Sequence, residues 1–245
     1  MSKNDEINYI TSVATKDKVP VDAFIDYLAR KPYSDVKCWE YLMDISQILS
    51  VLPPTPARLL DLGCGSGWTT EIFARCGYDS LGLDIAPDFI TIAQTKVIPN
   101  LPLRYACHDY ENSIPFGVFD CAVIFDALHH ADNPDRVLAA ASGALRTGGT
   151  LVILEPGAGH STTADSLAVM AKYGTTEKDM PYSYYKEFLH QSTFVNPRQY
   201  LRIRQLPLTN LDSMVGPYHQ IQNLTGLCFE TAKNGLTSLV VATKA

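Results

Sequence analysis

The chain has 245 residues, enough for one large α/β domain with an appendage and too few for several domains. Its formal net charge of −6 and the lack of a Lys/Arg cluster predict that it does not bind nucleic acid. No apolar run reaches the length of a membrane span, and the polar segment Met1–Glu6 lacks the apolar core of a secretion signal. The six cysteines are scattered singly without a C-x-x-C pair, so we expect a protein of the reducing cytoplasm. The oligomeric state is left open.

The first 52 residues are predicted to form a helical cap over one side of the fold. Val21–Arg30 has apolar residues at helical spacing. A second helix is expected from an N-cap at Ser34 to the prolines that begin at Pro53. The cap either only covers the sheet or also roofs a ligand pocket with an aromatic side chain, for which the candidates are Tyr27, Tyr33 and Trp39.

The stretch from Arg58 to Asp84 is the most informative part of the chain. A short apolar run leads into a glycine-rich loop, a helix is predicted over Thr69–Cys76, and a second apolar run ends on Asp84. Glycines permit a tight turn and let a ligand approach the backbone. An acid about twenty residues after such a loop can accept hydrogen bonds from a ribose diol. The stretch therefore predicts a nucleoside-binding site of the Rossmann kind.

The glycine spacing indicates which nucleoside is bound. A dinucleotide-binding loop reads G-x-G-x-x-G, whereas here the third glycine comes one position early, giving Gly63, Gly65 and Gly67. Trp68 stands where the dinucleotide glycine would be, and an indole is a poor fit beside a diphosphate. The loop, with Asp61 before it, instead resembles motif I of the class I (Rossmann-like) S-adenosylmethionine (SAM) methyltransferases.

Strands and helices alternate after the glycine loop. Strands are predicted at Leu103–Cys107, Phe119–Phe125 and Thr150–Leu154, and helices at Pro87–Lys96 and Pro134–Arg146. This alternation predicts an α/β fold with a doubly wound, mostly parallel sheet and helices on both faces. Ligands of such sheets bind at the carboxyl ends of the strands, where the strand order reverses.

The last third of the chain is less regular. Gly157 and Gly159 form a flexible joint before predicted helices at Thr163–Tyr173 and Tyr182–Gln191. Strands at Tyr200–Leu206 and Ser238–Thr243 complete a seven-stranded sheet, and Pro207–Gly235 has no assigned structure. We therefore expect four parts: the cap at 1–52, the ligand-binding core at 53–156, a lid over the acceptor at 157–192, and closing strands at 193–245.

The resemblance extends over roughly Arg58–Glu155. It includes Phe119-Asp120, the segment Asp126-Ala-Leu-His-His, and Leu145-Arg-Thr-Gly-Gly-Thr-Leu, and it is greatest for the ubiquinone/menaquinone-biosynthesis-type small-molecule methyltransferases. It implies the Rossmann-like methyltransferase fold, SAM as cofactor with S-adenosylhomocysteine as product, and a small-molecule methyl acceptor. It does not indicate which acceptor is used, or whether oxygen, nitrogen or carbon is methylated.

The resemblance also implies roles for individual residues. Asp84 stands at the position of the ribose-binding acid, and Asp109 at the position that accepts from the adenine amine. Asp61 contacts the cofactor, orients the glycine loop through backbone N–H groups, or does both, and Asp126 either lines the site or holds a loop. The complete set of predicted cofactor-binding residues is Asp61, Gly63, Cys64, Gly65, Gly67, Trp68, Asp84, Ile85, Asp109, Tyr110 and Asp126.

A hydroxyl acceptor benefits from a general base, whereas an amine or an activated carbon can react without one. His129 and His130 are adjacent, so we expect at most one of them to face the pocket. His130 is the candidate base, Glu155 its substitute, and a structural role the alternative for both. No metal is predicted, because neither the histidine pair nor Cys107-His108 has the spacing of a zinc site.

Two other functions stay open at this point. A nicotinamide (NAD(P)) oxidoreductase is disfavoured by Trp68 and by the glycine spacing. A non-catalytic SAM-binding sensor or pseudoenzyme is a further possibility, because no sequence pattern identifies the acceptor site.

Overall fold

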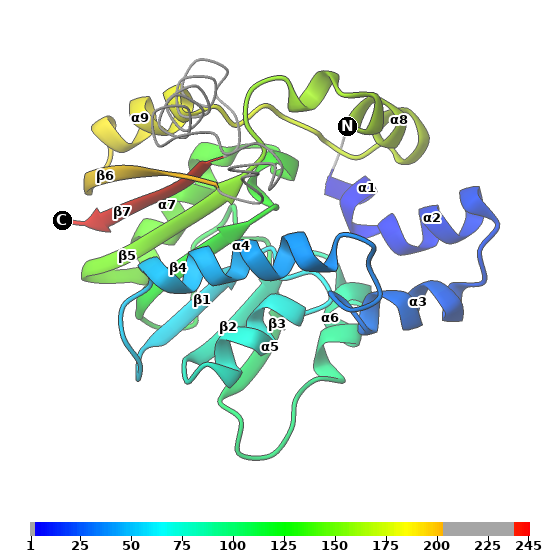
Figure 1. The fold of residues 1–245 in the computed structure, drawn as a ribbon, viewed down its shortest axis with the longest axis horizontal. Helices are drawn as coiled ribbons and strands as arrows, with labels where there is room; N and C mark the ends of the chain where they lie inside the picture. The colour runs from blue at the N-terminus through cyan, green and yellow to red at the C-terminus, as the bar shows by residue number, and fades with distance from the viewer. Residues whose placement is uncertain (1–2, 203–237) are drawn as a thin grey trace, which may run out of the picture.

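The computed structural model describes residues 3–202 and 238–245. The protein is built around a central sheet (Figure 1). Its strand order is β3-β2-β1-β4-β5-β7-β6. The strands are β1 (Arg58–Leu62), β2 (Asp79–Asp84), β3 (Leu103–Cys107), β4 (Phe119–Phe125), β5 (Leu145–Glu155), β6 (Phe194–Leu201) and β7 (Ser238–Lys244). Strands β1 to β5 run parallel, and β7 is antiparallel to both β5 and β6. The predicted doubly wound, mostly parallel, seven-stranded sheet is confirmed.

The apolar strands are buried on both faces, as parallel strands require. Neighbouring residues of β1 show this: Leu59 packs in the cluster with Ile48 and Phe73, whereas Leu60 packs in the cluster with Leu138 and Leu189. Helices α4 (Cys38–Val51) and α5 (Trp68–Arg75) therefore cover one face, and α7 (Pro134–Ala144) and α9 (Tyr182–Gln191) cover the other (Figure 1). Helix α6 (Pro87–Gln94) packs against β2 and β3.

The strand order reverses beside β1, whose neighbours are β2 on one side and β4 on the other. The connections that leave the carboxyl ends of β1 and β4 therefore run in opposite directions, which opens a crevice there. This crevice is where the sequence predicts the ligand.

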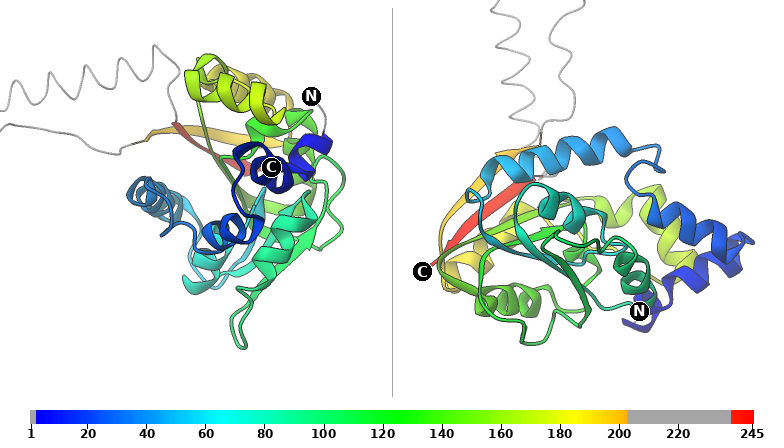
Figure 2. Two further views of the ribbon diagram at one scale, coloured as in Figure 1. Left: turned by 90° about the vertical axis from the view of Figure 1, so that its right-hand side faces the viewer. Right: turned by 90° about the horizontal axis from the view of Figure 1, so that it is seen from below.

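Four helices precede β1, and α8 (Ala164–Tyr173) and α9 follow β5. The first three helices are α1 (Lys3–Ile7), α2 (Tyr9–Asp17) and α3 (Val21–Ala29). Helix α8 lies beside α2 (Figure 2). There the Tyr173 hydroxyl donates to Asp17, and the Tyr173 ring meets Tyr9 edge to face. The N-terminal helices and the segment that follows β5 thus contact each other beyond the carboxyl ends of the strands.

Several predicted boundaries are wrong for identifiable reasons. Helix α4 begins at Cys38 because the Ser34 hydroxyl donates to the carbonyl of Tyr27 and does not cap the helix. Strand β5 begins at Leu145 because that residue already pairs with Phe119 of β4, so α7 ends at Ala144.

Strand β6 also begins earlier than predicted. It starts at Phe194, which pairs with Lys244 of β7. The predicted end of this strand at Leu206, and the stretch Pro207–Gly235, lie outside the described residues. Within residues 3–202 and 238–245, no helix combines the length and the apolar character needed to cross a membrane.

Candidate active site

The glycine loop after β1 is tied to the end of β2. The backbone N–H groups of Gly63 and Cys64 both donate to the carbonyl of Leu83, at 2.8 and 3.0 Å. Gly63, Gly65 and Gly67 have φ values of 79°, 51° and 82°, in the left-handed region that favours glycine. The loop conformation therefore depends on all three glycines.

The space beside each glycine differs. A Cβ atom on Gly63 would lie 2.3 Å from the Cβ of Ala127, and one on Gly67 would lie 2.7 Å from the Tyr105 ring. A Cβ on Gly65 would meet nothing within 4 Å. Gly63 and Gly67 are thus required by packing, whereas Gly65 borders open space.

Asp84, at the end of β2, has its carboxylate fixed by the backbone. One oxygen accepts from the N–H of Gly65 at 2.8 Å, and the other accepts from the N–H of Ala86 at 2.9 Å. Burial raises the pKa of this carboxyl to about 6, although both backbone hydrogen bonds oppose the change. Each oxygen can still accept a further hydrogen bond, so the group is suited to a diol.

Asp61 lies beneath the loop. It is buried, and one of its oxygens accepts from the hydroxyls of Thr69 and Thr70, both at 2.6 Å. These bonds join β1 to the first turn of α5. Asp61 therefore holds the start of the helix that follows the loop, through threonine hydroxyls and not through the backbone N–H groups expected from the sequence.

A cavity of about 740 Å³ opens at the carboxyl ends of the strands, between the core, the helices of the cap and α8. The predicted site residues that line it are Gly63, Cys64, Gly65, Trp68, Asp84, Ile85, Asp109, Tyr110, Asp126 and His130. Asp61, Gly67 and Glu155 are not among the lining residues. Tyr27 of the cap lines the cavity, whereas Tyr33 and Trp39 are exposed side chains outside it.

Glu155, at the end of β5, holds the segment after β4. One of its oxygens accepts from the N–H groups of Ala127 and Leu128, at 2.7 and 2.8 Å. The other accepts from Nδ1 of His129 at 2.6 Å. With its side chain buried and occupied in this way, Glu155 is poorly placed to take a proton from an acceptor.

The expectation that at most one of the two histidines faces the pocket is wrong. Both line the cavity, and in the 3-10 turn η1 (Leu128–His130) their rings lie against each other with centroids 3.9 Å apart and a tilt of 41° between the ring planes. Burial alone would lower the pKa of His129, but Glu155 outweighs it and raises the pKa to about 9. Burial and the neighbouring His129 lower the pKa of His130.

His130 has a defined tautomer. Its Nδ1 lies 2.7 Å from the carbonyl oxygen of Thr176, and a carbonyl can only accept, so Nδ1 carries the proton. In the neutral ring Nε2 is then the acceptor nitrogen. This is the protonation state that a general base requires.

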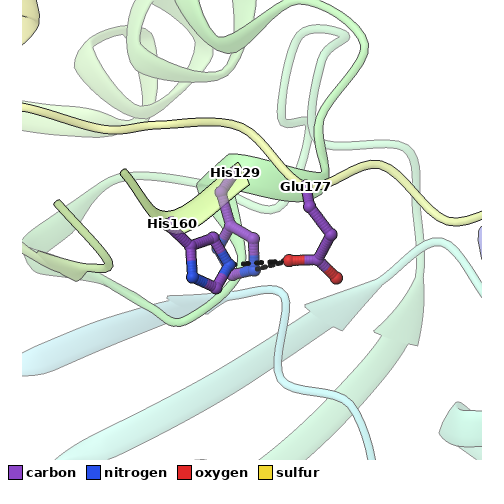
Figure 3. Close-up of side chains that lie close together, drawn as sticks. All are labelled: His129, His160 and Glu177. Atoms are coloured by element: carbon purple, nitrogen blue, oxygen red, sulfur yellow. Dashed lines mark hydrogen bonds and ion pairs between the residues drawn. The ribbon is translucent and has the colours of Figure 1, made fainter. Parts of the chain in front are cut away.

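Two further residues of this region come from the lid segment, which is defined here as residues 157–192. His160 and Glu177 line the cavity, and their side chains converge on that of His129 (Figure 3). Nε2 of His160 lies 2.7 Å from a carboxylate oxygen of Glu177, and Nε2 of His129 lies 3.5 Å from the same oxygen. The sequence prediction missed both residues, because no spacing rule relates three positions that are brought together only by folding.

Comparison with known proteins agrees with this geometry. A family model described as a methyltransferase domain matches residues 60–153. Over 188 residues, 75% of this chain and 76% of the relative, the chain is 28% identical to the ubiquinone biosynthesis O-methyltransferase of Xanthomonas campestris pv. campestris (strain B100). Over 96 residues, 37% of this chain and 43% of the relative, it is 40% identical to the magnesium-protoporphyrin O-methyltransferase of Rhodobacter capsulatus. The chain belongs to the class I SAM-dependent methyltransferases.

The fold of this methyltransferase is also similar to solved structures. The crystal structure of a SAM-dependent methyltransferase from Mesorhizobium loti has a TM-score of 0.61 at 20% identity, over 82% of this chain and 98% of that chain. The resemblance read from the sequence is confirmed at the level of family, fold and enzyme class. The matches give no support to the oxidoreductase alternative.

Asp109 of the methyltransferase lies at the cavity, but the N-terminal helix engages it. Lys3 of α1 donates to one oxygen at 2.7 Å, and the N–H of Glu111 donates to the other at 3.0 Å. Burial acts to raise the pKa of Asp109, yet these hydrogen bonds lower it, so the group is ionised at neutral pH. Helix α1 therefore closes the side of the cavity at which the sequence predicts adenine.

Proposed function

We propose that this methyltransferase binds SAM in the cavity and transfers the methyl group to a hydroxyl oxygen of a small molecule. The observation that carries the cofactor proposal is the open space beside Gly65, directly next to the fixed carboxylate of Asp84. The two relatives named above are O-methyltransferases of small molecules, which supports an oxygen acceptor.

The described residues fit the parts of SAM. Asp84 would accept from the ribose diol, and Asp109 would accept from the adenine amine. Gly65 would let the ligand approach the loop, because no side chain occupies that space. When bound, SAM supplies a methyl group activated by its sulfonium, so the protein has to bind, orient and exclude water.

The acceptor would lie between the helices of the cap and the histidine segment. Aromatic side chains from the cap line the cavity and suit a flat or apolar molecule, and they are Tyr9, Phe24, Tyr27 and Tyr41. His130, with Nε2 as its acceptor nitrogen, would take the proton of the acceptor hydroxyl as the oxygen is methylated. The acceptor oxygen must lie in line with the methyl group, which the walls of the cavity would enforce.

The remaining proposals concern organisation and setting. We propose a functional division into a cap (1–52), a SAM-binding core (53–156), a lid (157–192) and closing strands (193–245). The tyrosine–aspartate contact between α8 and α2 supports joint closure of lid and cap over the acceptor. The scattered free cysteines support a cytoplasmic location, and the acidic chain supports an acceptor other than nucleic acid.

The experiment that tests this function combines binding with transfer. Calorimetry should show binding of SAM and S-adenosylhomocysteine and none of NAD. Incubation with methyl-labelled SAM and a cell metabolite extract should label a small molecule, and treatment that separates ethers and esters from amines would identify an oxygen product. Binding of SAM without any transfer would indicate the sensor alternative, and a labelled amine would overturn the hydroxyl acceptor.

A further inference from the structure

His129, His160 and Glu177 form a cluster of three potential metal ligands on the wall of the cavity. One donor atom from each lies within 4.8 Å of the others. His129 comes from the core after β4, whereas His160 and Glu177 come from the two ends of the segment that carries α8 (Figure 3). The cluster therefore joins the lid segment to the core.

The orientation of His129 is independently fixed. Glu155 accepts from its Nδ1 at 2.6 Å, so the other ring nitrogen, Nε2, points to His160 and Glu177, and it binds a metal ion once its proton is released. Glu155 is itself held by two backbone N–H groups. A carboxylate behind the imidazole is the arrangement that orients histidine ligands in metal sites, because it fixes the tautomer and the ring plane.

The spacing of His129 and Glu177 suits a small tetrahedral ion, and His160 lies close enough to complete the set with a small movement. Bonds of about 2.0–2.1 Å in tetrahedral geometry place neighbouring donors about 3.3 Å apart. The His129–Glu177 distance of 3.5 Å matches this value. The His160–Glu177 distance of 2.7 Å is that of the hydrogen bond present without an ion, so His160 would retreat by about 0.6 Å on metal binding.

Glu177 has histidines as its charge partners, and a metal ion would bind there by displacing ring protons. Its side chain is only 8% exposed, and within the described residues its ion pairs run to His129, His130 and His160 and to no lysine or arginine. Two imidazoles and one carboxylate suit zinc and its neighbours in the first transition row. Magnesium and calcium prefer sites built from oxygen alone.

We propose that His129, His160 and Glu177 bind one divalent transition-metal ion of the zinc class, with an open coordination position that takes an oxygen of the methyl acceptor. Three protein ligands and one open position are the pattern of catalytic zinc sites. The part that concerns the acceptor rests on the proposed function, whereas metal binding by the three side chains does not. The competing interpretation is a hydrogen-bonded cluster that only holds the lid segment in place.

The test uses the full chain, stripped of metal with a chelator, and titrates it with Zn²⁺ against a chromophoric competitor. Two variants each remove one ligand: His160→Ala and Glu177→Gln. His108→Ala is the matched control, because His108 bonds to the carbonyl of Ser113 and is not among the residues that line the cavity. A Cys76→Ser/Cys107→Ser variant removes the two exposed thiols among the described cysteines, which could also take up zinc.

We expect the wild type to bind one more Zn²⁺ ion per chain than either ligand variant does. If the variants still bind that ion, the affinity of the wild type for it should be at least about tenfold higher. The histidine control and the cysteine variant should match the wild type. Zn²⁺ should also raise the melting temperature of the wild type and the control more than that of the ligand variants. Equal zinc affinity in all five proteins would overturn the proposal.

S-adenosylhomocysteine binding is measured in the same proteins. If the ligand variants keep it, they are folded, and their loss of zinc is specific to the site. If no protein binds S-adenosylhomocysteine while zinc still distinguishes the variants, the proposed function fails and the metal site stands. If the variants lose zinc and S-adenosylhomocysteine together, and their melting temperature falls without added metal, the cluster is structural and the proposal fails.

Discussion

The carboxylate of Asp84 accepts a hydrogen bond of 2.8 Å from the backbone N–H of Gly65, across 19 residues of chain. This contact joins the end of β2 to the one glycine of the loop that borders open space. It places an acid and an accessible backbone at the same point of the cavity. The first two predictions follow from this pair.

We expect nucleoside binding to weaken below pH 6. The ribose diol donates to the ionised carboxylate, and burial raises the pKa of Asp84 to about 6 in the free protein. At pH 5 only about a tenth of this group is ionised, so affinity should be about tenfold lower than at pH 8. The ligand to use is methylthioadenosine, which keeps the adenosine of SAM without its titrating amine and carboxylate.

Asp84→Asn is the control for that titration. It should bind methylthioadenosine more weakly at pH 8, by about ten- to a hundredfold, because hydrogen bonds to a charged group contribute about 1.5–3 kcal/mol. Its affinity should no longer change between pH 5 and pH 8. A pH dependence that persists in this variant would assign the effect to another group, such as Asp61, whose pKa burial also raises to about 6.

The glycines of the loop should separate folding from binding. Gly65→Ala places a methyl group in open space, so it should lower the free energy of unfolding only by the strain of the left-handed backbone, about 1–2 kcal/mol. The same methyl group should lower the affinity for SAM by about tenfold or more, because it fills the space that the ligand needs. Gly63→Ala adds an overlap at 2.3 Å with Ala127, and overpacking costs about 1–3 kcal/mol more. Denaturant unfolding and calorimetry together check this. Full SAM affinity in a folded Gly65→Ala protein would place the cofactor elsewhere.

Asp109 should recognise the exocyclic amine of adenine. Asp109→Ala should weaken SAM, yet leave almost unchanged the affinity of an analogue that lacks this amine. Lys3→Ala is the matched variant, because Lys3 donates to the same carboxylate. If SAM and the analogue lose affinity equally in Asp109→Ala, and Lys3→Ala shows the same loss, Asp109 acts by anchoring α1 and not by binding the adenine amine.

His130 should be needed for transfer and not for cofactor binding. His130→Asn keeps a donor near the position of Nδ1 for the carbonyl of Thr176, but it has no basic nitrogen. Turnover of the labelled acceptor should fall by about a hundredfold or more, with SAM affinity and melting temperature close to wild type. A structural histidine would instead lower stability in His130→Ala and be rescued by the asparagine. Normal turnover in His130→Asn would exclude this residue as the base.

Much of the fold was predictable because its signals are local. Strands β3 and β4 and helix α9 have the predicted bounds, since apolar runs and flanking glycine or proline mark them in the sequence. The left-handed glycines and the acid at the end of β2 follow from the short segment between β1 and β2. Strands β5 and β6 begin earlier than predicted because their first residues are held by partner strands, which a single segment does not reveal.

The doubly wound sheet, the glycine loop and the acid at the end of β2 can be predicted from the amino acids alone, because backbone conformation and apolar periodicity are properties of neighbouring residues. Which polar side chains line the cavity becomes evident only in the folded chain. Asp61 and Glu155 are not among the lining residues: one oxygen of Asp61 accepts from two threonine hydroxyls of α5, and Glu155 accepts from the segment after β4. His129, His160 and Glu177 meet because the lid segment folds back over the sheet, and such long-range packing leaves no trace in the spacing of residues along the chain.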